Sequence, residues 1–147
     1  MQNLVIEAII TATSKKQGGK FKQDIPTKTA YLKTDEENAK LLEDFGLTRY
    51  TSKEDQEDYF IVKFPQNVVL YFPNGLGERR PDLSLVEVDG EETNNFRTTE
   101  DKPLKLNILK GEKDGNTFYR LQAILVDSAD DIEEIKPENP FGIEQAF

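Results

Sequence analysis

The turn Asp114-Gly115 constrains the fold of this 147-residue chain more than any other short feature. Asp-Gly between two strand-like segments, here 104–110 and 116–126, is a strong signal for a tight β-hairpin. Alternation along the second segment predicts a core face made of Tyr119, Leu121, Ala123 and Leu125. The opposite face is predicted to carry an aromatic ring, a guanidinium and an amide toward solvent: Phe118, Arg120 and Gln122.

Most of the remaining chain also has the pattern of β-strands. Apolar and β-branched runs predict further strands at 4–13, 27–33, 59–65, 68–73 and 83–88. We expect the segments 59–65 and 68–73 to pair with each other. One helix is predicted at 35–45, with Thr34 and Glu37 as a capping box and Gly46 at its C-terminal end.

These elements predict a mainly β fold with one short helix. Short alternating strands around a single core hide their edges best by closing into a barrel, so we expect a small OB-like β-barrel. The helix follows the second strand, whereas the standard OB order places it after the third. We expect the barrel domain to span residues 1–126 and residues 127–147 to be a flexible, disordered acidic tail.

The charge of the chain is unevenly distributed. The formal net charge is −9, and residues 127–147 hold seven acids and one Lys. Residues 14–33 hold six Lys and one Asp. A basic segment combined with an acidic end is a hint of nucleic-acid contact or of an interaction tail, although acidic ends also serve solubility.

Several kinds of chemistry are disfavoured by the composition. The chain has no His and no Cys, which removes the usual zinc ligand sets and every triad that needs His. The carboxylate runs have the pattern of solvated faces, and no glycine-rich phosphate loop is complete. We therefore expect no enzyme activity, no metal and no cofactor. No apolar run is long enough to span a membrane and no secretory signal is evident, so we expect a cytoplasmic protein.

The residue types in this chain fit the binding of single-stranded nucleic acid better than they fit catalysis. Such binding combines a positively charged groove with aromatic side chains on which bases stack. The candidate residues are Lys15, Lys16, Lys20, Phe21, Lys22, Tyr31, Lys33, Arg79, Arg80, Phe96, Arg97, Phe118 and Arg120. Each aromatic residue has an alternative role in the core, and the Lys-rich hairpin has an alternative role in protecting a sheet edge.

The C-terminal segment "DSADDIEEIKPENPFGIEQAF", together with the run "NTFYRL", resembles bacterial and phage single-stranded-DNA-binding proteins. Members of that family combine a small OB-type barrel with an acidic tail that ends in Pro-Phe or in Phe. The resemblance implies a non-catalytic single-stranded-DNA-binding protein for replication or recombination, encoded by a phage or mobile element and acting in the host cytoplasm. It also implies that Pro140, Phe141 and Phe147 bind replication or recombination proteins.

A second function is also compatible with the sequence. An acidic protein-interaction module, such as an inhibitor that imitates DNA phosphates, would also be rich in carboxylates. That alternative needs acids spread over the folded body, whereas here they are concentrated in residues 127–147. A homodimer is compatible with either function, because an unpaired strand edge favours self-association.

Overall fold

The fold is taken from a computed structural model. It describes residues 1–16, 27–53, 56–65, 67–73, 75, 77–81, 85–88, 91–94, 96–99 and 102–134. Within these ranges the chain is mainly β, with one α-helix and one turn of 3-10 helix. The predicted fold class is therefore confirmed.

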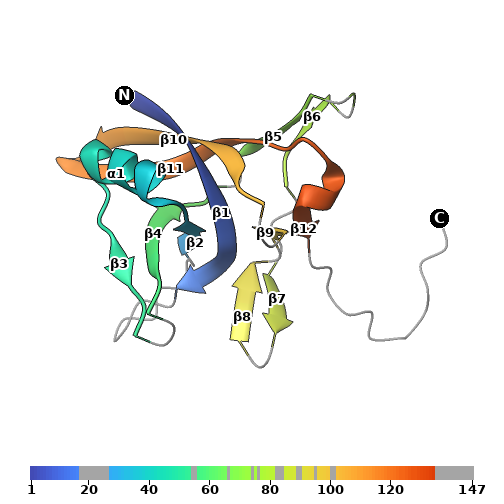
Figure 1. Ribbon diagram of the computed structural model, residues 1–147, viewed down its shortest axis with the longest axis horizontal. Coiled ribbons are helices and arrows are strands. Elements are labelled where there is room, and N and C mark those ends of the chain that lie inside the picture. Colours follow the sequence, from blue (N-terminus) through green and yellow to red (C-terminus); the bar gives the residue numbers. More distant parts are fainter. Residues whose placement is uncertain are drawn as a thin grey trace.

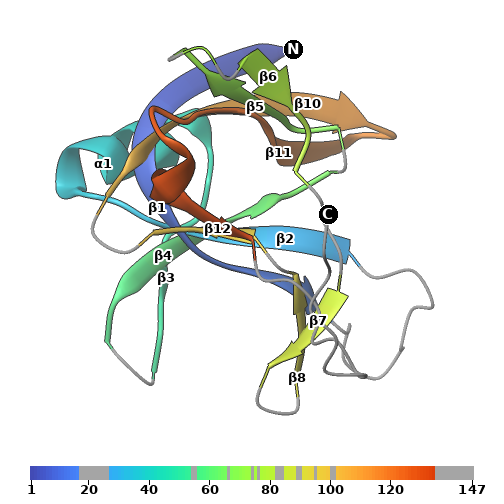
Figure 2. The same ribbon diagram turned by 90° about the vertical axis from the view of Figure 1, so that its right-hand side faces the viewer.

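Five strands close into a ring around one core (Figures 1 and 2). They are β1 (Gln2–Lys16), β2 (Thr27–Lys33), β4 (Asp58–Lys63), β10 (Leu104–Lys113) and β11 (Asn116–Leu125). The antiparallel order β10-β1-β2-β4 is a Greek key, in which the fourth strand returns beside the first. β11 closes the ring, since it is antiparallel to β10 and parallel to β4. A five-stranded Greek-key barrel is the OB-like architecture.

β1 is bent and pairs with two other strands of the barrel. Its first half pairs with β10 and its second half with β2, and the register shifts between Ile10 and Ala12. A bulge of this kind bends a strand and increases its twist, which a small closed barrel requires. The interior is filled by aliphatic and aromatic side chains, the largest fully buried ones including Ile6, Ile10, Leu32, Phe60, Phe64, Leu106, Ile108 and Leu121.

The helix α1 (Glu36–Phe45) lies between β2 and β4 in the chain, as the sequence predicts. Asp35 caps it by accepting a hydrogen bond from the Asn38 backbone N–H, so the predicted Thr34–Glu37 capping box is wrong. Thr34 instead donates its hydroxyl to the Glu7 carbonyl on β1. Gly46 ends the helix in the left-handed conformation, which confirms that prediction.

The segment between β4 and β10 adds shorter strands to the barrel. They are β5 (Val69–Phe72), β6 (Gly77–Arg79), β7 (Leu85–Val88), β8 (Glu91–Asn94) and β9 (Phe96–Thr98), whereas β3 (Tyr50–Thr51) precedes β4 and pairs with it. The predicted pairing of 59–65 with 68–73 is wrong. β4 and β5 instead pair in parallel with successive stretches of β11, at Arg120 and at Ala123–Leu125.

The β10–β11 hairpin is confirmed, but its predicted core face is only half right. Asp114 and Gly115 both have positive φ, 53° and 80°, as a tight hairpin turn of the Asp-Gly type requires. Leu121 is buried, and Tyr119 packs against the core. The register then shifts at Gln122, and beyond it the buried residues are Ile124 and Val126. Ala123 and Leu125 are therefore not core residues, because a bulge exchanges the two faces of the strand.

The folded domain continues beyond the predicted boundary at Val126. A turn of 3-10 helix, η1 (Ala129–Asp131), leads into β12 (Ile132–Glu134), which pairs with β9. Ile132 is buried in the main core, and the buried Asp131 carboxylate accepts a hydrogen bond from Lys102 Nζ at 2.8 Å. Residues 127–134 thus belong to the domain, and the prediction of a flexible tail applies only to 135–147, which lie outside the described residues.

Candidate nucleic-acid interface

The outer face of β2 and β4 is the centre of the candidate interface. The inward residues of these strands are buried: Ala30, Leu32, Phe60 and Val62. The residues between them have the opposite orientation: Thr29, Tyr31 and Lys33 on β2, and Tyr59, Ile61 and Lys63 on β4. The face therefore presents aromatic, apolar and cationic side chains together.

Three tyrosines from three adjacent strands form a continuous row on this face. Tyr50 on β3 stacks on Tyr59 of β4, with 5.9 Å between ring centroids and 29° between the ring planes. Tyr59 also meets Tyr31 of β2 edge to face at 5.8 Å. Tyr50 is 45% exposed, so at least one ring of the row is open to solvent.

The start of β11 brings a fourth ring and a further cation to the same face, namely Phe118 and Arg120. Arg120 pairs across the parallel ladder with Lys63 of β4. Lys63 Nζ lies 5.6 Å and Arg120 Cζ lies 5.9 Å from the centroid of the Phe118 ring. Both cations lie within cation–π distance of the ring, so the ring has positive charge close beside it.

The far end of the Phe118 ring lies close against the opposite strand of the hairpin. Gly111 of β10 is its cross-strand partner, and a Cβ atom built on Gly111 would come within 2.4 Å of Phe118 Cζ. Glycine is therefore required for this ring position, since only a residue without a side chain leaves the space free.

A groove of about 520 Å³ opens where β4 and the beginning of β11 diverge. Ile61 and Phe118 contribute apolar walls, while Lys63, Lys113 and Asp114 contribute charge. The volume falls in the range of ligand-sized clefts, which combine apolar walls with a few polar groups. The tip of the β10–β11 hairpin forms one side of this groove, so the turn predicted from Asp114-Gly115 shapes the site.

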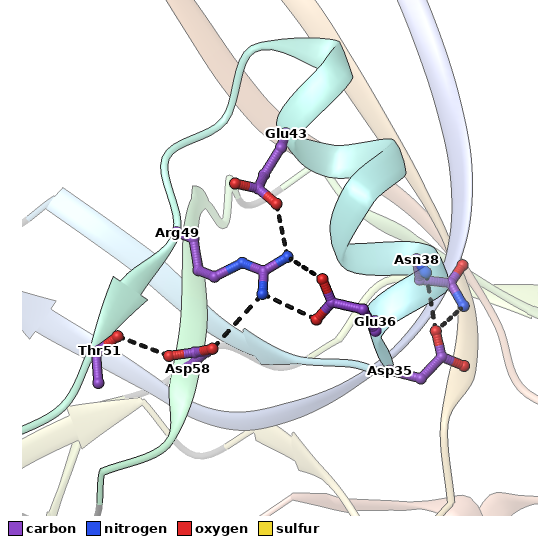
Figure 3. A network of polar contacts seen from close by, with 7 residues as sticks. All are labelled: Asp35, Glu36, Asn38, Glu43, Arg49, Thr51 and Asp58. Atoms are coloured by element: carbon purple, nitrogen blue, oxygen red, sulfur yellow. Dashed lines mark hydrogen bonds and ion pairs between the residues drawn. The ribbon is translucent and has the colours of Figure 1, made fainter.

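An arginine between the helix and the sheet positions β3 (Figure 3). The Arg49 guanidinium donates to Glu36 at 2.9 and 3.1 Å and to Glu43 at 2.6 Å, both on α1. It also forms an ion pair with Asp58 of β4 at 3.6 Å, and Asp58 accepts a hydrogen bond from Thr51. These contacts connect α1 to β3 and β4, which carry two of the three tyrosines of the row.

The charges of this network are mutually stabilised. The hydrogen bond from Arg49 holds the pKa of the Glu36 carboxyl below its ordinary value, and the carboxylates raise the pKa of Arg49 further above its usual range. At the helix start, the Asn38 backbone N–H lowers the pKa of Asp35. The acidic residues Glu36, Glu43 and Asp58 are thus paired with Arg49. Glu57 likewise forms an ion pair with Lys33 of β2.

Four of the predicted nucleic-acid residues lie elsewhere. Phe96 is 1% exposed and packs against Phe64 at 5.4 Å, so its predicted role as a stacking residue is wrong. Arg97 pairs with Glu133 at 2.6 Å where β9 meets β12. Arg79, the last residue of β6, lies over the ring of Phe72 on β5, and Arg80 follows it in the chain. Both views place β6 away from β3 (Figures 1 and 2).

The remaining predicted residues lie at the end of β1 or outside the described residues. Lys15 and Lys16 end β1, where their backbones pair with β2. Lys20, Phe21, Lys22, Pro140, Phe141 and Phe147 lie outside the described residues. The predictions for these residues remain predictions.

Of the predicted set, the structure brings together Tyr31, Lys33, Phe118 and Arg120. It adds residues that sequence reasoning missed: Tyr50, Tyr59, Ile61, Lys63 and Lys113. Alternation in "YFIVKF" was a usable signal for Tyr59, Ile61 and Lys63, because Phe60, Val62 and Phe64 mark the core face. No comparable signal identifies Tyr50, whose strand is two residues long.

No protein-family model, curated protein or solved structure matches this chain. Among the residues that the structure describes, no group of three or more carboxylates is arranged to hold a metal ion. In the same part of the chain, no helix is both long and apolar enough to cross a membrane.

Proposed function

We propose that this chain is a non-catalytic single-stranded-DNA-binding protein and that DNA lies across the outer face of β3, β4, β2 and the start of β11. The observation that carries the proposal is the tyrosine row continuing toward Phe118 and its two cations. In OB-type barrels the second and third strands and the adjoining loops bind oligonucleotides. Here those strands are β2 and β4.

The energetics of stacking support this proposal. Each base stacked on an aromatic ring contributes about 1–3 kcal/mol, largely without regard to sequence. Lys63, Lys113 and Arg120 supply positive charge beside the rings for the phosphate backbone. Single strands are exposed during replication and recombination, so the proposed activity belongs to those processes.

The decisive measurement is fluorescence anisotropy with a labelled single-stranded oligonucleotide over a range of salt concentrations. We expect binding at low salt that weakens linearly on a log–log scale, because neutralised phosphates release counterions. Phe118→Ala and Tyr50→Ala should each weaken binding by about 1–3 kcal/mol.

Tyr71 provides the matched control. It is 44% exposed on β5, against 45% for Tyr50, but it lies outside the tyrosine row. Tyr71→Ala should leave affinity unchanged. Equal losses from Tyr50→Ala and Tyr71→Ala would assign the DNA to a different surface, and absence of binding by the wild-type protein at low salt would refute the proposed function.

A further inference from the structure

The groove beside the β10–β11 hairpin has the features of a pocket for a single nucleobase. β4 and β11 meet at Lys63 and Arg120, and the groove lies where the residues before them separate. One wall is formed by Phe118, and the far end of its ring lies against Gly111 of β10. A base that stacks there would present its hydrogen-bonding edge to neighbouring polar groups.

The hairpin tip places an acidic residue at this groove. Asp114 is exposed, has a φ of 53° and lines the groove next to Lys113. The backbone alone does not require an acid, because Asn adopts the same left-handed conformation. A negative charge beside a phosphate chain lowers affinity unless the acid accepts hydrogen bonds from the bound strand.

Resting on the proposed function, we propose that this groove selects guanine through the Asp114 carboxylate. On its pairing edge guanine presents two adjacent donors, N1–H and the 2-amino group, and a carboxylate has two acceptor oxygens to match them. Thymine presents a single N–H between two carbonyl oxygens, which would repel the second carboxylate oxygen. Adenine and cytosine each present one donor group beside an acceptor nitrogen.

The test uses thymine oligonucleotides of one length that carry a single central guanine, hypoxanthine, cytosine or adenine. Hypoxanthine keeps N1–H and lacks the 2-amino group. We expect the guanine oligonucleotide to bind about tenfold more tightly than the all-thymine one. Hypoxanthine should lose most of that preference, since only one donor remains.

The variant Asp114→Asn keeps the turn and removes the charge. It should abolish the guanine preference and bind the all-thymine oligonucleotide more tightly than wild type does. Glu112→Gln is the matched control, because Glu112 is an exposed acid of the same hairpin that does not line this groove. It should retain the full preference for guanine.

Two results would overturn this inference and leave the proposed function intact. They are equal affinity of the wild-type protein for the guanine and thymine oligonucleotides, and an undiminished preference in Asp114→Asn. Failure of every oligonucleotide to bind would instead refute the proposed function, and the guanine site with it.

Discussion

Gly111 shows how a residue without a side chain determines the position of another residue's ring. The space that its Cβ would occupy is filled by Phe118, and the ring is flanked by Lys63 and Arg120. Phe118 is thus fixed by the strand opposite as well as by its own. A fixed ring favours stacking, because less side-chain freedom is lost when a base binds.

Gly111→Ala should therefore act through Phe118. The new methyl group would force the ring away, and we expect a loss of about 1–3 kcal/mol in the free energy of unfolding, with weaker DNA binding. In a Phe118→Ala background the same substitution should cost nothing, because the obstructing ring is absent. Chemical denaturation of the four proteins of this double-mutant cycle measures the coupling. Equal costs in both backgrounds would show that Gly111 is required for a reason other than the ring.

At the level of single residues, the sequence predicted side-chain orientation correctly wherever alternation was unbroken. Tyr31, Phe118 and Leu121 all have the predicted orientation. Alternation failed at Ala123, since the extra residue at Gln122 depends on how β11 meets β10 across the sheet. The prediction for Phe96 was wrong for another reason: the residue was assigned to a polar loop, but it packs against Phe64 and lies on a strand that pairs with the distant β12.

At the level of elements, the helix and the edge strand β3 are held together by charge. α1 buries only Ala39 and Leu42, so its apolar contact with the barrel is limited. Arg49 adds contacts to two helix carboxylates and to β4. The position of the helix could be predicted from the sequence. The ion pairs of Arg49 with the helix could not, because Arg49 lies outside the helix and belongs to no recognisable motif.

Arg49→Met should lower stability in a way that depends on pH. The pKa of Glu36 in the folded protein is below its ordinary value of 4.5. A depressed acid contributes stability above its unfolded pKa and loses that contribution as pH falls through the folded value. The gap in melting temperature between wild type and Arg49→Met should thus be full at neutral pH and shrink below about pH 4.5.

Arg80→Met supplies the control for this prediction, since Arg80 is an exposed arginine outside the network. It should change stability little at any pH. A gap for Arg49→Met that stays constant down to strongly acidic pH would mean that the arginine contributes through its packing instead of its charge.

At the level of the whole molecule, the acidity of the C-terminal part is mostly within the fold. Residues 127–147 hold seven acids, and five of them lie within 127–134. That segment contains η1 and β12 and is anchored by Ile132 and by the Asp131–Lys102 ion pair. Composition alone suggested one continuous tail, because the partner strand β9 lies far away in the sequence.

Two truncations separate the folded segment from the rest. Ending the chain after Glu134 removes two acids and one Lys, so it should change neither the stability nor the affinity for single-stranded DNA by much. Ending it after Val126 removes β12 and exposes the core around Ile132, which should cost at least about 2 kcal/mol. Thermal melts and salt titrations of DNA binding compare the two. A stable, well-folded protein ending at Val126 would show that β12 is dispensable.

The pairing of β1 with β10 also has a consequence during synthesis of the chain. Ala8 pairs with Leu104 and Gln2 with Lys110, so the first strand meets one of its two barrel neighbours only after most of the polypeptide has left the ribosome. Contacts between residues so far apart in sequence slow folding and leave apolar strand edges unpaired in the meantime. Nascent chains with β1, β2 and β4 alone are therefore the species most exposed to aggregation, and a chaperone that shields strand edges would act on them first.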